Sequence, residues 1–557
     1  MRQRRSRRMH RRYYGAMRAF LTARWAPLLA TLAVVGYAVT VIGFGLVYRP
    51  LHNDEGVTLS VAVRPSALDV LDTAIDQRHG PPLHYLAVHA SLVLRDDMLG
   101  LRLPSALFGI LAIGLAYGFG RELLGRSGGA VLALITATIP EVVHLAQFAR
   151  GYTAMLAASY GSMWLLLLLV RTRRARYVVP YAISALLLVS AHPFGLFALA
   201  SELILLVVLG LAPLRRGWRA QRRNLIVLTT ALAAGVVATV LLWRVYSKLQ
   251  TKYGVGHGGA VVKLSSGNFW RRIGDAWTGS SHVVVWLALA GAALAGLVLL
   301  YLRDRRAALI LGVWLVQPLV SLSLLTATSS DFAPERHLSF MIPAYAAAIA
   351  TFVVELGRRA GRRGPWIAAG VTVLLIGSGA VALGRDVGDF NPDLRNASLA
   401  IASSFGPRDV LLSTGGVPEQ GADSRLYGAY AVLEAPGGSA LSNWRDVGKD
   451  TGCDLVLRLE HVPNPAGAWV MLRAGDPDAL ESALMRLGYE QVAAYGPFVI
   501  GRVPLRRQTI ASAVHWGAKT YKAAARANTN VHDFSRLARI YRDARGMAHD
   551  PELCKSA

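Results

Sequence analysis

Long apolar runs, separated by short polar segments rich in arginine, make up most of the first 384 residues. A helix needs about 20 mostly apolar residues to cross a bilayer, so this pattern predicts an α-helical polytopic membrane protein with about eleven spans. We expect the spans near residues 26–47, 101–123, 128–147, 152–170, 177–191, 194–212, 225–246, 283–301, 307–326, 338–356 and 365–384.

The arginine clusters orient these spans. The basic N-terminus (1–25) precedes the first span, and arginine clusters follow the fourth, sixth, eighth and tenth spans. Lys and Arg concentrate in cytoplasmic loops, so the pattern predicts a cytoplasmic N-terminus and a transmembrane module over 26–384. A cleaved signal peptide is the competing interpretation, but no small-residue cleavage site clearly follows the first apolar run. The external side then receives segments 48–100, 247–282 and everything after 385.

Two parts of the first external segment, 48–100, carry helical patterns. Residues 66–78 begin with Ser66 and Asp69, a capping pair, and continue with apolar residues at helical spacing, which predicts an amphipathic interfacial helix. Counting residues 81–95 as a span would invert every later arginine loop. We therefore expect a surface or re-entrant helix there, packed against protein.

The C-terminal part has another character. Residues 385–504 alternate β-type stretches (410–412, 455–459, 469–472) with helical ones (394–404, 477–487), which predicts a small extracytoplasmic α/β domain. The tail 505–557 is basic and helical in pattern, and lies either on the membrane or on this domain. Cys453 and Cys554, the only two cysteines, could form a disulfide on an oxidising face, but a pair of cysteines alone does not establish one.

Composition agrees with the membrane class. Of the 557 residues 53% are hydrophobic and 17% charged, and 60 basic against 34 acidic residues give a net charge of +26. A strongly basic chain raises nucleic acid as a partner, but here the arginines stand in short clusters between apolar runs, so no nucleic acid is expected. The abundance of Arg and Ala is typical of a GC-rich bacterium, which places the protein in a bacterial inner (plasma) membrane.

Ionisable groups gather at the expected external ends of the spans. Asp54 and Glu55 follow the first span, and such adjacent acids are often only solvated charges. Here further polar groups share their side of the membrane, where charges near the bilayer are costly and tend to mark a site. These groups are His79, His84, His89, Arg150, Tyr152, His192, Glu335, Arg336 and His337.

The order of these motifs resembles the glycosyltransferase C superfamily, in the branch of the protein O-mannosyltransferases, the lipid A aminoarabinose transferases and their bacterial relatives. The shared motifs are Asp54-Glu55, Pro81-Pro82-Leu83-His84-Tyr85, Arg102-Leu103-Pro104-Ser105, Gln147-Phe148-Ala149-Arg150-Gly151-Tyr152, Ala191-His192-Pro193-Phe194-Gly195 and Pro334-Glu335-Arg336-His337-Leu338. Phe148 stands where the family usually has an acid, and Gly151 where it more often has proline.

The resemblance implies transfer of a sugar, mannose or another hexose or pentose, from a polyprenyl-phosphate donor in the membrane to an extracytoplasmic glycolipid, cell-wall polysaccharide or protein. Asp54 would then be the base that takes the acceptor's proton, with Glu55 orienting it. Arg150 and Arg336 suit the donor phosphate, because guanidinium binds phosphate bidentately, and His84, His192, Tyr152 and His337 suit hydrogen bonding to it. A divalent metal stays open, since one carboxylate pair does not make a metal site.

Two other classes of function share some of these sequence features. A lipid-linked substrate transporter or flippase would also need charges facing a cavity, but it predicts internal repeats with broken helices, and no such symmetry is visible. A membrane-anchored binding protein would not need so many spans. The sequence therefore favours a membrane glycosyltransferase.

Overall fold

The computed structural model describes most of residues 36–211, 267–328, 335–364, 392–404, 409–413, 444–446, 467–473, 477–504 and 510–527. It divides into two compact units. The first contains Met1–Tyr48, Pro65–Ala90 and Arg102–Gly388, and the second contains Arg49–Arg64, Ser91–Leu101 and Asp389–Ala557. Each unit is described by itself.

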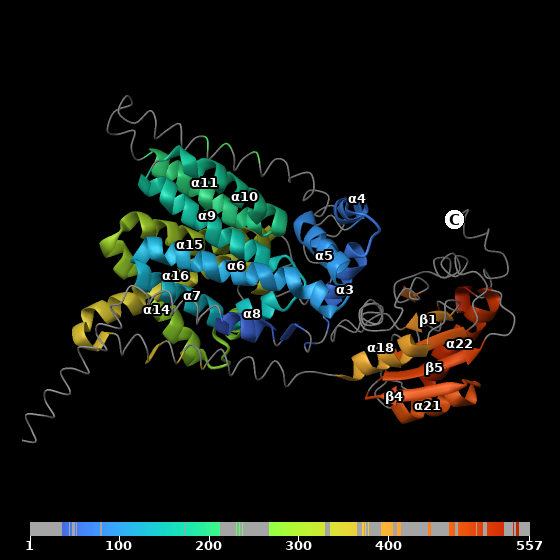
Figure 1. Cartoon of the computed structure of the whole chain (residues 1–557). Coiled ribbons are helices and arrows are strands. Elements are labelled where there is room, and N and C mark those ends of the chain that lie inside the picture. Colours follow the sequence, from blue (N-terminus) through green and yellow to red (C-terminus); the bar gives the residue numbers. More distant parts are fainter. Residues whose placement is uncertain are drawn as a thin grey trace, which may run out of the picture. The chain divides into compact units, whose positions relative to one another are not determined.

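The first unit is a helical bundle (Figure 1). It contains α4 (Ala67–Asp72), the π-helix η1 (Thr73–Gln77), most of α5 (Pro82–Leu94) and of α6 (Met98–Leu124), α7 (Arg126–Thr138), α8 (Pro140–Ala146), α9 (Tyr152–Thr172), α10 (Val178–Ala191), α11 (Gly195–Leu211), α13 (Gly267–Thr278), α14 (Val283–Arg303), α15 (Arg305–Thr328) and α16 (Ile342–Arg359), with 3-10 turns η2 (Ala175–Tyr177), η4 (Glu335–Met341) and η5 (Gly361–Arg363). Among the described residues, five helices are long and apolar enough to cross a bilayer. The protein is a multi-pass helical membrane protein.

The predicted span 128–147 is wrong in one respect, because it is two helices and not one. α7 and α8 meet at an angle of 67°. Pro140 is the first residue of α8. A proline there has no N–H to donate within a continuous helix, and its ring would clash with the carbonyl of the preceding turn. The predicted spans 225–246 and 365–384, and the first part of 26–47, lie almost entirely outside the described residues.

The two helices predicted before the second span are present. Ser66 caps α4 by accepting a hydrogen bond from the Asp69 N–H at 3.2 Å. α5 has 13 residues, which at 1.5 Å per residue reaches about 20 Å and is too short to cross a bilayer.

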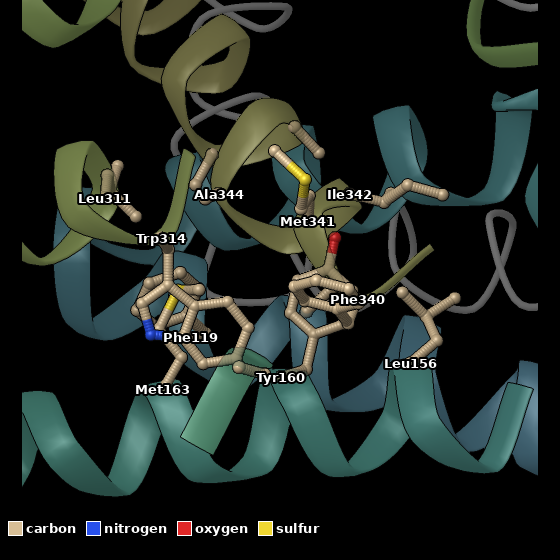
Figure 2. Close-up of a cluster of buried hydrophobic side chains, with 14 of the residues drawn as sticks. Phe119, Leu156, Tyr160, Met163, Leu311, Trp314, Phe340, Met341, Ile342 and Ala344 are labelled. Atoms are coloured by element: carbon tan, nitrogen blue, oxygen red, sulfur yellow. The ribbon is translucent and has the colours of Figure 1, made fainter. Parts of the chain in front are cut away.

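α9 is the central helix of the bundle. In its most apolar 18-residue window 83% of the residues are buried, against 17% for α14, which shows that α14 lies at the periphery. Figure 2 shows the packing around α9: side chains from α6, α15, η4 and α16 meet its own in one cluster of buried hydrophobic residues. The labelled members are Phe119, Leu156, Tyr160, Met163, Leu311, Trp314, Phe340, Met341, Ile342 and Ala344.

The second unit contains a mixed five-stranded sheet of order β2-β1-β3-β5-β4 (Figure 1). The strands are β1 (Asp409–Ser413), β2 (Trp444–Asp446), β3 (Gly467–Arg473), β4 (Gln491–Tyr495) and β5 (Phe498–Pro504). β1 pairs in parallel with β2 and β3, whereas β5 runs antiparallel to β3 and β4.

Two helices pack with this sheet, α18 (Pro392–Ser404) and α21 (Pro477–Arg486), and a third helix, α22 (Ile510–Ala527), packs with α21. Trp469 and Met471 of β3 and Phe498 and Ile500 of β5 are buried with Ala397 and Ile401 of α18. Alternate strand residues share a face, so this set forms one side of the sheet. The predicted strand 455–459, Cys453 and Cys554 lie outside the described residues.

The basic tail, whose position the sequence left open, contributes α22. This helix packs with α21. The Thr520 hydroxyl is hydrogen-bonded to the Tyr489 hydroxyl, and both residues are buried. The described part of the tail is therefore attached to the α/β domain. The placement of this domain outside the membrane remains a prediction.

Candidate functional site

The loop between α8 and α9, residues 147–151, is fixed by close contacts within the first unit. The Gln147 amide donates to the carbonyls of Val41 and Ile42, at 3.0 and 3.3 Å. The Ser105 hydroxyl donates to the carbonyl of Arg150 at 3.3 Å. Gly151 lies so close to the end of α10 that an added Cβ would come within 2.2 Å of the Ala191 carbonyl oxygen. This approach explains why glycine stands where the family more often has proline, and it brings the loop against His192.

Aromatic and imidazole rings from three segments meet beyond this loop. The Tyr152 ring, at the start of α9, lies 4.8 Å from the His192 ring and 5.4 Å from the His337 ring, measured between centroids. The two imidazoles are 5.0 Å apart. Phe194 contacts His337 at 4.9 Å, and the Tyr152 hydroxyl lies 3.4 Å from His337 Nε2. Segments far apart in the sequence therefore form one cluster.

Two guanidinium groups flank these rings. Arg150 Nη1 donates to the Tyr85 hydroxyl of α5 at 3.4 Å. The guanidinium of Arg336 lies over the Phe148 ring, 5.7 Å from its centroid, and Phe148 stacks on Tyr152 at 6.2 Å. A guanidinium over an aromatic face is a favourable cation–π arrangement that leaves its edge available for further hydrogen bonds.

The cluster is electrostatically positive. Burial, followed by the charges of His337, Arg150 and Arg336, holds the pKa of His192 well below its usual range. Burial, together with these cationic neighbours, thus keeps the imidazole neutral. An anion bound among these groups would instead raise the pKa of His192. We call Tyr85, Phe148, Arg150, Tyr152, His192, Phe194, Arg336 and His337 the cationic–aromatic cluster.

Most of the predicted phosphate-binding residues belong to this cluster. Arg150, Tyr152, His192, Arg336 and His337 are brought together as the sequence analysis expected. His84 is buried in α5, and its Cβ lies 3.5 Å from the position that a Cβ on Gly151 would take. Phe148 and Phe194 were not assigned a role from sequence, because aromatic residues at span ends usually belong to the interfacial belt.

Asp54 and Glu55 belong to the second unit. Both stand in the first turn of helix α3 (Asn53–Ala62), within the segment 48–100 that follows the first predicted span. Acidic residues are favourable in the first turn because the helix dipole is positive there. Asp54 is half-buried and Glu55 is 1% exposed. His52, His79 and the side chain of Glu335 lie outside the described residues.

Arg102, the first residue of the shared motif Arg102-Leu103-Pro104-Ser105, is fully buried in α6. Its guanidinium donates to the Leu46 carbonyl at 3.0 Å and so connects α6 to the chain at Leu46. The ring of His144 is tilted against that of Phe148, with 5.8 Å between the two centroids. Among the described residues, no three His, Cys, Asp or Glu side chains are grouped as metal ligands.

Comparisons with known proteins agree with this architecture. Residues 78–243 match the family described as dolichyl-phosphate-mannose-protein mannosyltransferase. A comparison with curated protein sequences finds no match. Among solved structures, ArnT from Cupriavidus metallidurans in the apo state is similar with a TM-score of 0.55 and 15% identity, over 85% of this chain and 97% of that one.

Two further structures share the fold and contain lipid phosphates. ArnT from Cupriavidus metallidurans bound to undecaprenyl phosphate matches with a TM-score of 0.54 and 17% identity, over 86% of this chain and 98% of that one. The oligosaccharyltransferase AglB from Archaeoglobus fulgidus, in complex with an inhibitory peptide and a dolichol-phosphate, matches with a TM-score of 0.51 and 11% identity, over 81% and 70%. The chain shares its fold with these solved structures, which are glycosyltransferases of the C superfamily. The resemblance predicted from the sequence motifs is therefore confirmed at the level of this superfamily.

Proposed function

We propose that this protein is a membrane glycosyltransferase that moves a hexose or pentose from a polyprenyl-phosphate donor to an acceptor outside the cytoplasm. The observation that carries the proposal is the cationic–aromatic cluster, in which the guanidinium groups of Arg150 and Arg336 flank the rings of the cluster. The superfamily fold supports it, as do the two similar structures that hold undecaprenyl phosphate and dolichol-phosphate.

In this proposal the cluster binds the donor phosphate. The reaction breaks the bond between the anomeric carbon and the phosphate oxygen, so negative charge develops on the departing polyprenyl phosphate. Fixed guanidinium groups stabilise such charge without reorganising during the reaction. Arg150 and Arg336 take this role, while Tyr152, His192, His337 and His84 offer hydrogen bonds to the phosphate oxygens.

The acceptor hydroxyl must lose a proton as it attacks the anomeric carbon. We assign this proton to the Asp54 carboxylate, with Glu55 orienting the acceptor or the base. A positioned base contributes about 10²–10⁴-fold to the rate. Glu55 is almost fully buried and Asp54 only half-buried, so Asp54 is the more accessible of the two. One new glycosidic bond forms, and the proton and the phosphate leave separately.

The test uses the purified full chain in liposomes. It is incubated with radiolabelled polyprenyl-phosphate hexoses and pentoses and a membrane lipid extract, and the products are searched for transferred label. A labelled product that disappears in Asp54→Asn, but not in the exposed control Asp96→Asn, supports the proposal. Movement of the donor between leaflets without any transferred label would instead favour a flippase and overturn it.

A further inference from the structure

A charged cavity lies at the opposite end of α9 from the cationic–aromatic cluster. α9 begins at Tyr152 in that cluster and reaches Arg171 nineteen residues later, about 28 Å away at 1.5 Å per residue. Arg171 lines an open cavity of about 720 Å³, at the ends of α6, α9 and α14 and the start of α15. This separation is close to the thickness of a bilayer's hydrocarbon core.

The acidic groups of this cavity are already paired. Its lining contains two carboxylates, Glu122 and Asp304, and Arg171 forms ion pairs with both, at 2.9 and 2.7 Å. The Asp304 carboxylate also accepts the backbone N–H groups of Arg306 and Ala307, each at 3.1 Å. These contacts hold the lining of the cavity in place. Both carboxylates are paired with Arg171, so neither neutralises the other arginines of the lining.

Four further arginines line the same cavity. Arg303 pairs with Glu355, a residue that is not in the lining. Arg121, Arg305 and Arg306 are exposed, and no carboxylate of the described residues is paired with any of them. Arg305 lies over the ring of Tyr301, 5.3 Å from its centroid. The cavity therefore presents three guanidinium groups that can accept an anion.

An apolar surface leads directly to this cavity. Leu294, Val298 and Leu302 follow one side of α14 and are 65%, 52% and 73% exposed. Leu302 directly precedes Arg303 of the lining. In a membrane such a surface faces acyl chains, so an occupant with a charged head and an apolar body would match both parts. A soluble anion would use only the arginines.

We propose that this cavity binds the phosphodiester headgroup of an anionic membrane phospholipid, with its acyl chains along the exposed side of α14. Arg121, Arg305 and Arg306 contact the phosphate oxygens, and the Arg171 network holds the surrounding helix ends in place. The site is separate from the donor site and does not depend on the proposed transferase activity. Basic cavities between membrane helices recognise lipid headgroups by this charge.

Native mass spectrometry of the detergent-purified full chain tests the site. Dioleoyl-phosphatidylglycerol, the anionic probe, is titrated against zwitterionic dioleoyl-phosphatidylcholine. We expect the anionic lipid to bind more tightly by more than about tenfold. The triple variant Arg121→Gln/Arg305→Gln/Arg306→Gln should weaken it on the order of a hundredfold, since each guanidinium near a lipid surface contributes about a factor of five. Arg174→Gln, an exposed arginine at the same end of α9 but outside the lining, is the matched control.

Three results would overturn the proposal. These are equal binding of the two lipids, unchanged binding in the triple variant, and full displacement of the lipid by millimolar glycerol 3-phosphate, which would assign the arginines to a soluble anion. If the triple variant does not fold, Arg306→Gln alone is titrated in the same way and should weaken binding about fivefold. The KM for the polyprenyl-phosphate donor should not change in either variant.

Discussion

The hydroxyl of Tyr181 on α10 donates a hydrogen bond of 2.9 Å to the carboxylate of Glu202 on α11, and neither residue is exposed. Glu202 is a carboxylic acid within an otherwise apolar helix. Next to it, the Ser201 hydroxyl donates to Gln317 of α15 at 2.6 Å. A polar network thus connects α10, α11 and α15 inside the bundle.

This network predicts a specific pattern of stability. Glu202→Leu leaves the Tyr181 hydroxyl buried without its acceptor and should lower the free energy of unfolding by about 1–3 kcal/mol. Glu202→Gln keeps an acceptor and should cost less. The double variant Tyr181→Phe/Glu202→Leu removes both partners and should recover most of the loss. Thermal unfolding in detergent measures all three, and a double variant as unstable as Glu202→Leu would rule out the hydrogen bond as the cause.

Close packing of α14 on α16 predicts intolerance at Gly296. An added Cβ there would come within 1.8 Å of the Ala348 carbonyl oxygen. Gly296→Ala must push the two helices apart, at a cost of about 1–3 kcal/mol. Gly291→Ala in the same helix is the control, because no atom lies within 4 Å of its Cβ and alanine favours helix. Equal unfolding temperatures in the two variants would contradict the close approach.

The phosphate role of the cluster predicts a loss of donor affinity. Arg150→Ala and Arg336→Ala each remove a charge-assisted contact worth about 1.5–3 kcal/mol, so donor binding should weaken by at least about tenfold. The affinity for the acceptor should change much less. Arg64→Ala, an exposed arginine, controls for the loss of positive charge alone. Unaltered donor affinity in a folded Arg150→Ala protein would make Arg150 a plain structural residue.

The position of His192 predicts a pH effect on stability. Its pKa is held well below the usual range by burial, His337, Arg150 and Arg336. Above about pH 6.5, the usual value for histidine, both folded and unfolded chains keep it neutral. As the pH falls below that value, His192 binds a proton in the unfolded chain but not in the folded chain, so the folded state loses stability. The unfolding temperature should therefore drop between pH 7 and pH 5, and drop less in His192→Gln.

His282→Gln, which alters an exposed histidine, should leave the pH dependence of the wild type unchanged. Donor phosphate should oppose the effect of His192, because a bound anion favours the protonated imidazole. The pH dependence of unfolding should become shallower with the donor present. The same slope in the wild type and in His192→Gln would show that other groups cause the acid instability.

The roles of the acidic pair predict different kinetic losses. Asp54→Asn keeps the size of the side chain but cannot accept a proton, so turnover at saturating donor should fall by about 10² or more. Glu55→Gln should cost less if Glu55 only orients the acceptor. The opposite order would exchange the two roles. Near-normal turnover in both variants would remove the carboxylates from the mechanism.

The sequence predicted those features that depend on local chemistry. Ser66 and Asp69 form the expected helix cap, because a cap requires only residues three apart. Arg150, His192 and Arg336 could be expected together because each stands at the predicted external end of a span. α3 was missed because Asn53 to Gly56 has the composition of a loop, although the acidic first turn was a signal for a helix.

Features that depend on the packing of distant segments could not be derived in the same way. Glu202 is visible as one acid within an apolar run, but its partner Tyr181 is known only once α10 and α11 are placed side by side. Phe148 and Phe194 look like belt aromatics until the ring contacts with Tyr152 and His337 show their position. The bend at Pro140 had a local signal in the proline itself. Many membrane helices tolerate proline, however, so the residue alone did not show that it would break this helix.

The deep burial of α9 bears on how the protein is made. Its Tyr160 hydroxyl is bonded to Thr136 of α7 at 2.5 Å, so one partner of α9 is synthesised before it. Trp314 and Phe340, which cover α9 from the other side, follow more than 140 residues later in the chain. During synthesis α9 must therefore remain in the membrane with part of its eventual surface uncovered. Assembly of the bundle is complete only after η4 and α16 have been inserted, and a chain interrupted before that point leaves its central helix open to lipid and to membrane quality control.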